Sequence, residues 1–295
     1  MLALLGPTAS GKSEIAVRLA ERFDAEVISI DSMQVYRGMD IGTAKPSALE
    51  RRGIPHHLID VAEPEDEFTV AEFRRLGHLA LESVAGSTVI ISGGSGLHFR
   101  ALVDPMSFAP TDPDLRATLE RLEAGKLVSS LLAVDPVAGS VVDLANQRRV
   151  IRAFEIYQLT GETPTVRAGM AAAEDVRRYV PEVAFEAVGV DPGEALESRI
   201  HARLAAMREG GLLEEVRRLG DRLGRTARNA VGYREIQSAL RGEFTMDEAF
   251  SRAASNTRKL ARRQRTWFQR DPRIRWIPWI EDPDERARRV EETFA

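Results

Sequence analysis

The chain has 295 residues, with 41 Lys and Arg against 45 Asp and Glu, a formal net charge of −4 and no cysteine. This length suits one large or two modest domains, and the lack of cysteine excludes disulfides, thiolate metal sites and a catalytic thiol. No apolar run approaches the ~18 residues of a membrane span, so we expect a cytoplasmic protein without a membrane partner.

The first third of the chain alternates predicted strands with predicted helices. The short apolar or β-branched runs Leu2–Leu5, Glu26–Ile30 and Thr88–Ser92 are typical of strands, whereas Val70–Val84 has helical spacing. This alternation predicts an α/β core with a parallel sheet, and such sheets bind ligands at the carboxyl ends of their strands.

A helical segment interrupts this pattern. Between about residues 112 and 180 the strand signals vanish and helices such as Leu115–Leu122 and Arg148–Leu159 are predicted, before Val183–Asp191 resumes the strand pattern. We therefore predict a catalytic core of residues 1–111 and 181–295, with C-terminal helices, and a helical insertion domain of residues 112–180. The C-terminal part is expected to contain helices over Glu194–Met207, Leu212–Leu219 and Met246–Phe268 and a Trp-rich tail at Ile274–Ile280.

A glycine-rich loop follows the first strand and precedes a helix. It matches the pattern G-x-x-x-x-G-K-S/T in full, in the context that the motif requires. The matching residues, which we call the phosphate loop, are Gly6, Pro7, Thr8, Ala9, Ser10, Gly11, Lys12 and Ser13. The loop predicts a P-loop NTPase-like core that binds a nucleotide, ATP included, or another di- or triphosphate, with Ser13 available to Mg²⁺.

In nucleotide hydrolases and kinases with a phosphate loop, a second apolar strand usually ends in an acidic residue that holds Mg²⁺, and the corresponding strand of this chain has no such residue. Thr88–Ser92 runs into Gly93-Gly94, and the acid nearest in character is Asp31, at the end of the second strand. This placement favours group transfer over hydrolysis. Asp31 can hold Mg²⁺ or act as a general base, or it can simply form an Asx-turn, and the amide of Gln34 can pair with a base edge.

Further motifs carry a resemblance over nearly the whole chain. They are Gly6–Ser13, Asp31–Pro46, His56–Asp60, Arg148–Ala153, Gly232–Glu235 and Arg262–Phe268. In this order they resemble the bacterial tRNA dimethylallyltransferases of the tRNA isopentenyltransferase family. The resemblance implies transfer of a dimethylallyl group from its diphosphate to the exocyclic amine of the adenine 3′ of the anticodon in tRNA, with release of pyrophosphate.

The resemblance also implies roles for individual residues. The phosphate loop would hold the donor diphosphate, with Thr8 and Lys12 in contact with it and Ser13 beside Mg²⁺. Asp31 would be the general base, and Arg203, or alternatively Arg199, would steady the pyrophosphate. Contacts to the tRNA anticodon stem-loop would come from Asp31, Ser32, Met33, Gln34, Ser95, Arg116, Arg148, Arg149, Arg152 and Arg234.

Three positions depart from the family pattern. Ser95 replaces the usual Thr and keeps the hydroxyl, His98 replaces a Tyr, and Gln147 stands where Pro is common. None of them lies in the phosphate loop or at the proposed base, so they bear on RNA contacts rather than on the reaction.

A basic segment near the C-terminus suits an RNA substrate. From Arg252 to Arg275 the chain has nine Lys and Arg residues against one acid, Asp271. We expect Arg262 and Arg263 to contact RNA phosphates, although a solvated helix face or internal ion pairs are the alternative. Trp267 is expected in the core.

Other interpretations remain open from the residues alone. His56 and His57 lack a third metal ligand at suitable spacing and suit a structural or channel role. The phosphate loop by itself fits an ATP-dependent small-molecule kinase, and a catalytically idle RNA-binding protein is a third possibility. For the transferase we expect a monomer that uses Mg²⁺, dimethylallyl diphosphate and tRNA.

Overall fold

The computed structural model of the protein describes residues 1–294 and divides into two compact units. Unit 1 comprises Met1–Val103 together with the chain from Val183 onward, and unit 2 is Asp104–Glu182. The limits at Val103 and Val183 differ from the predicted domain limits at residues 111 and 181, because the extended chain after Val103 clusters with the helices that follow it. That the units act as a catalytic core and an insertion domain stays a prediction.

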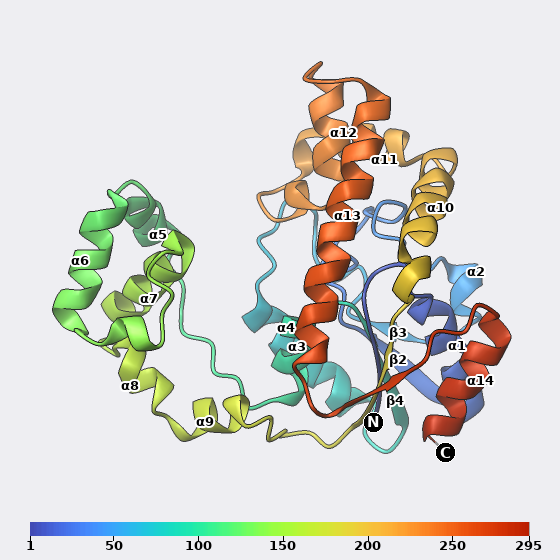
Figure 1. Ribbon diagram of the computed structural model, residues 1–295, viewed down its shortest axis with the longest axis horizontal. Coiled ribbons are helices and arrows are strands. Elements are labelled where there is room, and N and C mark those ends of the chain that lie inside the picture. The colour runs from blue at the N-terminus through green and yellow to red at the C-terminus, as the bar shows by residue number, and fades with distance from the viewer. Residues whose placement is uncertain (295) are drawn as a thin grey trace. The chain divides into compact units, whose positions relative to one another are not determined.

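Unit 1 is built on a six-stranded sheet in which all neighbouring strands are parallel (Figure 1). Its order is β3-β2-β4-β1-β5-β6. The strands are β1 (Leu2–Leu5), β2 (Ala25–Ser29), β3 (His56–His57), β4 (Thr88–Gly93), β5 (Glu186–Val190) and β6 (Ile274–Ile277). The prediction of an α/β core with a parallel sheet is confirmed, and the sequence analysis missed the two edge strands, β3 and β6.

Side chains of the central strands alternate between two apolar layers. Ala3 and Leu5 of β1 belong to the larger hydrophobic cluster, whereas Leu4 between them belongs to the second cluster. This alternation follows from the two-residue period of a strand. Since both faces are buried, the strands read in the sequence as continuous apolar runs rather than as alternating patterns.

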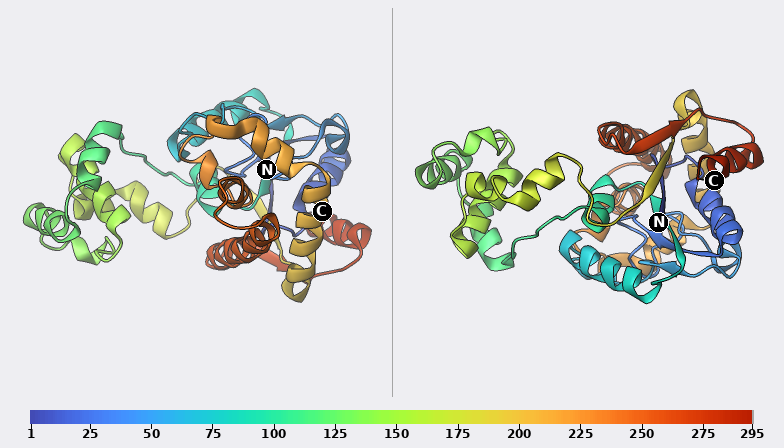
Figure 2. Two further views of the ribbon diagram at one scale, coloured as in Figure 1. Left: turned by 90° about the horizontal axis from the view of Figure 1, so that it is seen from above. Right: turned by 90° about the horizontal axis from the view of Figure 1, so that it is seen from below.

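Helices cover both faces of the sheet. In unit 1 they are α1 (Lys12–Phe23), α2 (Ala48–Arg51), α3 (Val70–Ser83), α4 (Gly96–Val103), α10 (Leu196–Glu209), α11 (Leu212–Leu219), α12 (Tyr233–Leu240), α13 (Met246–Gln269) and α14 (Pro283–Phe294). α1 and α14 pack side by side over the second hydrophobic cluster, as the views of Figure 2 show. α3, α4, α10 and α13 contribute to the larger cluster.

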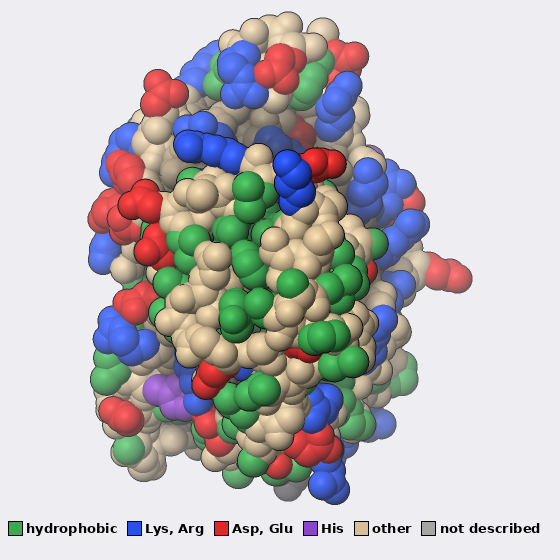
Figure 3. Space-filling model, turned by 90° about the vertical axis from the view of Figure 1, so that its left-hand side faces the viewer, with side chains coloured by type: hydrophobic (Ala, Val, Ile, Leu, Met, Phe, Trp, Pro, Cys, Tyr) green, Lys and Arg blue, Asp and Glu red, His purple; other side chains and the backbone are tan. Residues whose placement is uncertain are grey.

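Unit 2 is helical. Its helices are α5 (Pro113–Glu120), α6 (Ala124–Val134), α7 (Gln147–Thr160), α8 (Pro164–Ala168) and α9 (Ala171–Arg177). They enclose a small core of their own, which includes Leu119, Leu127, Leu131 and Val150. Figure 3 looks onto a face of the molecule where hydrophobic side chains lie over the middle and charged side chains toward the edges.

None of the helices that the structure describes is long and apolar enough to cross a membrane. The longest, α13, spans 24 residues and is strongly basic toward its C-terminal end. Its N-terminus has a capping box, in which the Thr245 hydroxyl accepts from the Glu248 amide and the Glu248 carboxylate accepts from the Thr245 amide.

Candidate active site

A pocket of about 480 Å³ lies where three parallel strands end. The phosphate loop follows β1, Asp31 comes shortly after β2, and Gly93 and Gly94 lie at the end of β4. All three segments line the pocket, and Arg203 of α10 and Gln264 of α13 complete it. The sheet topology therefore brings together residues that lie far apart in the sequence.

The phosphate loop has the shape that its sequence predicts. Gly6 has φ 151°, and a Cβ atom there would meet the carbonyl oxygen of Val190 at 2.1 Å, so only glycine fits. Gly11, in the left-handed region, is the N-cap of α1 and provides no side chain to cap the helix amides. The residues at this end of α1 line the pocket, and an uncapped helix N-terminus beside a pocket is a common arrangement for binding phosphate.

Lys12 and Arg203 bring positive charge to the pocket. Lys12 Nζ donates to the carbonyl oxygen of Pro7 at 2.6 Å and to Ser10 Oγ at 3.0 Å. Burial, and next the nearby Arg203, lower the pKa of Lys12 to about 7. Burial also lowers the pKa of Arg203, although Asp31 opposes this shift. A buried ammonium whose charged form is disfavoured, with a partly buried guanidinium nearby, is suited to binding an anion.

Asp31 forms the Asx-turn that the sequence left open as one alternative, and it does so with a single carboxylate oxygen. Its Oδ1 accepts from the amides of Met33 at 2.8 Å and Gln34 at 3.4 Å, which is an Asx-turn. No hydrogen bond to Oδ2 is found among residues 1–294. One carboxylate oxygen therefore fixes the side chain in place while the other remains available to a ligand or a proton.

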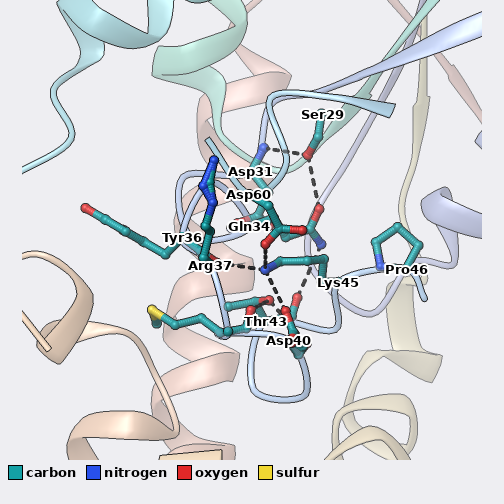
Figure 4. Close-up of polar contacts among 12 residues, drawn as sticks. Ser29, Asp31, Gln34, Tyr36, Arg37, Asp40, Thr43, Lys45, Pro46 and Asp60 are labelled. Atoms are coloured by element: carbon teal, nitrogen blue, oxygen red, sulfur yellow. Dashed lines mark hydrogen bonds and ion pairs between the residues drawn. The ribbon is translucent and has the colours of Figure 1, made fainter. Parts of the chain in front are cut away.

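Gln34 lies in the pocket but is bound within the protein (Figure 4). Its Nε2 donates to the carbonyl oxygens of Thr43 at 3.3 Å and Ala44 at 3.2 Å, and its Oε1 accepts from Ser29 Oγ at 3.1 Å. All the polar groups of the amide are engaged in this way. Gln34 thus supports the wall of the pocket, and pairing with a base edge would require it to exchange these partners.

The structure distinguishes the two candidate arginines on α10. Arg203 lines the pocket and donates through Nη2 to the carbonyl oxygen of Thr43 at 3.4 Å. Arg199 donates through Nε to the carbonyl oxygen of Ala9 at 2.6 Å and lies over the ring of Trp279. Arg199 therefore supports the phosphate loop, whereas Arg203 is the one positioned to meet a ligand.

Gln264 is a pocket residue that the sequence analysis did not single out. Its Oε1 accepts from the backbone amide of Thr8 at 2.8 Å. Its amide also fills the space beside Gly94, where a Cβ would lie 2.6 Å from Gln264 Nε2. The signal was its place between Arg263 and Arg265 in a motif of the family, but no pattern in the sequence gives the direction of a side chain on a helix.

Trp267 corrects a prediction. The ring is 44% exposed and lies against Gly96, where a Cβ would be 1.8 Å from a ring carbon. The core position on this part of α13 is taken by Phe268, which is 1% exposed. The expectation that Trp267 is in the core is therefore wrong, because α13 places neighbouring residues on different sides.

Ser95 and His98 form a pair at the start of α4. Ser95 Oγ lies 2.6 Å from His98 Nδ1, and the imidazole packs edge-on against Phe73. Burial lowers the pKa of His98 to about 4, so the ring is neutral at physiological pH. The residue that replaces the usual Tyr is thus a buried, neutral partner of the Ser95 hydroxyl.

The predicted RNA contacts fall in both units. In unit 2, Arg116 and Arg152 each pair with the buried carboxylate of Glu155 at 2.6 Å. Arg148 and Arg149 are exposed near the start of α7, and Arg149 lies 3.8 Å from Asp143. Arg116 and Arg152 therefore hold unit 2 together as well as carrying charge.

In unit 1, Ser32 and Met33 are partly exposed in the turn after Asp31, and Arg234 is half-exposed and paired with Glu235 at 2.7 Å. Arg262 and Arg263 are exposed, with no ion pair within residues 1–294. In the basic segment Arg252–Arg275, some of the charged side chains form ion pairs within the described residues and others do not. Its ion-paired members are Arg258, Arg265, Arg273 and Arg275. Part of this segment is therefore structural, and part is free to bind an anion.

The described residues of the pocket offer few ligands of their own to a divalent cation. Across residues 1–294 no group of three or more His, Asp or Glu side chains is arranged to hold a metal. The Ser13 hydroxyl is exposed in the pocket and has no hydrogen-bond partner in the described part of the chain. These donors suit Mg²⁺, which keeps several waters and takes the remaining oxygens from phosphates.

The two neighbouring histidines have structural partners. His56 and His57 form β3 beside β2, and His57 Nε2 lies 2.5 Å from Glu26 Oε2. His56 Nδ1 lies 2.9 Å from the carbonyl oxygen of Ile54, and the residue also lines the pocket. This agrees with a structural role rather than with a metal site.

The chain is similar to known proteins over most of its length. The family model described as IPP transferase matches residues 34–271. The tRNA dimethylallyltransferase of Streptomyces avermitilis is 44% identical over 94% of this chain and 89% of the relative, and that of Pseudarthrobacter chlorophenolicus is 44% identical over 98% and 96%.

Solved structures agree with this. The full-length tRNA isopentenylpyrophosphate transferase of Bacillus halodurans is 35% identical, with a TM-score of 0.72 over 99% of this chain and 94% of that chain. The names of these relatives support the transferase interpretation of the sequence and not the kinase alternative.

Proposed function

The chain belongs to the IPP transferase family, and from this premise we propose that it transfers a dimethylallyl group from dimethylallyl diphosphate to the exocyclic amine of the adenine 3′ of the anticodon in tRNA. The observation that carries this proposal is the position of Asp31. Asp31, which has one carboxylate oxygen without a partner among residues 1–294, lines the same pocket as the phosphate loop, Lys12 and Arg203.

In the proposed reaction the adenine nitrogen forms a bond to the allylic carbon while the bond from that carbon to the diphosphate oxygen breaks. The electron pair of the broken bond leaves with pyrophosphate. The nitrogen loses a proton, which Asp31 Oδ2 accepts. Because the nitrogen lone pair is delocalised into the ring, removal of this proton makes the amine a better nucleophile.

The leaving group needs positive charge where its own negative charge grows. The amides at the N-terminus of α1, Lys12 and Arg203 supply it from fixed positions. We propose that Thr8 and the rest of the phosphate loop bind this diphosphate, and that Ser13 holds Mg²⁺ against it. When bound, Mg²⁺ would neutralise part of the charge on the leaving pyrophosphate.

We propose that the RNA is held by the exposed arginines of both units, Arg262 and Arg263 among them, as well as by Ser95 and the Asp31–Gln34 turn. The adenine must leave its stack in the anticodon loop to enter the pocket, at a cost of a few kcal/mol. The proposal further includes a monomeric enzyme in the cytoplasm that takes the donor diphosphate, rather than ATP, at the phosphate loop.

The test is incubation of the protein with Mg²⁺, unmodified tRNA and radiolabelled dimethylallyl diphosphate, followed by digestion to nucleosides. We expect label on a single adenosine, which would also set aside a catalytically idle RNA-binding protein. Intact donor with consumption of ATP would instead restore the kinase interpretation.

A further inference from the structure

Glu215 of α11 is a buried carboxylate with an unusual set of partners. Its side chain is 3% exposed. Its Oε2 accepts from the backbone amides of Asp40 at 3.0 Å and Ile41 at 2.8 Å, and its Oε1 accepts from that of Gly42 at 3.1 Å and from the Tyr233 hydroxyl. Four donors thus satisfy both oxygens of a group that would otherwise be costly to bury.

The amides of Asp40 and Ile41 depend on this one side chain, and that of Gly42 is shared between Glu215 and the Tyr233 hydroxyl oxygen. No carbonyl oxygen among residues 1–294 accepts from the amides of residues 40–42. Three consecutive amides aimed at one anion form a nest, and here the anion is part of the protein. Tyr233 closes the arrangement: its ring lies so near Gly42 that a Cβ there would be 2.4 Å from a ring carbon.

The same loop forms a wall of the active-site pocket. The Ala44 amide donates to Ile41 and the Lys45 amide to Asp40, each at 2.9 Å, so the position of residues 40–42 sets that of residues 43 and 44. Lys45 adds ion pairs to Asp40 at 2.7 Å and Asp60 at 2.6 Å (Figure 4). The loop is therefore fixed from two directions, by Glu215 and by Lys45.

The carbonyl oxygen of Thr43 connects this loop to two pocket residues. It accepts from Gln34 Nε2 at 3.3 Å and from Arg203 Nη2 at 3.4 Å. Both distances are near the upper limit for a hydrogen bond, so a displacement of the loop by a few tenths of an ångström would break them. Neither Glu215 nor Tyr233 lines the pocket.

We infer that Glu215 is a positioning residue for the transfer reaction: by holding the amides of residues 40–42, it sets the Thr43 carbonyl that fixes Arg203 and Gln34 in the pocket. The inference rests on the proposed function, in which Arg203 steadies the leaving pyrophosphate. Glu215 does not line the pocket, so we assign its effect on kcat to Arg203, which does.

The test measures transfer by Glu215→Gln in the wild-type and Arg203→Ala backgrounds. A role that acts through Arg203 predicts a fall in kcat of about tenfold in the wild-type background and a much smaller loss in the Arg203→Ala background. The KM for dimethylallyl diphosphate should change less than about threefold, because the phosphate loop still holds the diphosphate. Equal losses of kcat in the two backgrounds would overturn the inference.

Two further variants keep the test decisive. Asp271→Asn changes another buried carboxylate of unit 1, which is bound to Arg273 and is absent from the pocket lining, and should leave kcat unchanged. Tyr233→Phe removes one of the four donors to Glu215 and leaves the carboxylate its three backbone amides. If Glu215→Gln does not fold, kcat of Tyr233→Phe is compared between the wild-type and Arg203→Ala backgrounds instead. Its smaller loss of kcat should likewise disappear in the Arg203→Ala background.

Failure of the inference can be told from failure of the proposed function. Absence of transfer by the wild-type protein would overturn both. Transfer by the wild-type protein, with kcat of Glu215→Gln within about twofold of it at a temperature where both are folded, would overturn only the role of Glu215.

Discussion

The side chain of Gln264 accepts a hydrogen bond from the backbone amide of Thr8, at 2.8 Å and across 256 positions of the sequence. This bond joins the basic helix α13 to the phosphate loop. One turn of that helix therefore carries both exposed arginines and a group that fixes the loop expected to bind the donor.

Replacement of Gln264 by Leu keeps the size of the side chain and removes the acceptor. The Thr8 amide then loses its partner and the loop its support, so we expect the Kd for inorganic pyrophosphate to rise by about tenfold, as measured by calorimetry. Gln269→Leu, an exposed change on the same helix, serves as the control. Equal Kd values for the two variants would show that the loop holds its shape without Gln264.

The role of Asp31 as general base can be tested with asparagine, which preserves the Asx-turn, rather than with alanine, which would also remove the turn. Asp31→Asn keeps an oxygen for the amides of Met33 and Gln34 but cannot take a proton at physiological pH. We expect kcat to fall by about 10²–10⁴, with the Kd for tRNA nearly unchanged. Near-normal turnover in single-turnover assays would remove Asp31 from the role of base.

The pKa of Lys12, lowered to about 7, predicts how affinity for the donor depends on pH. A bound diphosphate favours the charged ammonium, so Lys12 must take up a proton on binding whenever it is neutral in the free protein. Affinity for inorganic pyrophosphate should therefore be steady below pH 7 and fall as the pH rises from 7 toward 9. Titrations at several pH values, corrected for ionisation of the ligand itself, test this, and Lys12→Met should remove the dependence.

His98 predicts a loss of stability in acid. Its pKa is about 4 in the folded protein and near 6.5 when unfolded, so only the unfolded chain binds the proton between these values. The free energy of unfolding should consequently decline as the pH falls from 6.5, by about 3 kcal/mol from this residue at pH 4. Urea denaturation of His98→Phe should show a smaller decline, whereas the exposed His201→Gln should behave as the wild type.

Arg262 and Arg263 are expected to bind RNA phosphates. Their replacement by Ala should weaken tRNA binding and reduce the slope of log K against log salt by between one and two. Filter binding at several salt concentrations measures the slope. For comparison, Arg275→Ala removes a charge that is paired with Glu186, and it should change the slope less. An unchanged slope in the double variant would show that neither arginine faces phosphate.

The sequence by itself determined the parts of this protein that are local. Gly6–Ser13 is a continuous motif that can be recognised without any distant residue, and the apolar runs of β1, β2 and β4 are typical of strands. The sixteen residues from Asp31 to Pro46 are far more specific than the phosphate loop, and with the other motifs they carried the resemblance to a family, which the family match then confirmed.

Only the tertiary structure decided which distant residues share the pocket. Arg203 and Arg199 lie one helical turn apart with similar surroundings in sequence, and the packing of α10 directs one into the pocket and the other to the loop carbonyl of Ala9. Glu215 and Gln264 likewise gain their partners from helix packing. Hydrogen bonds between segments depend on side-chain direction and on the distance between elements, and neither quantity is encoded in the spacing of residues along the chain.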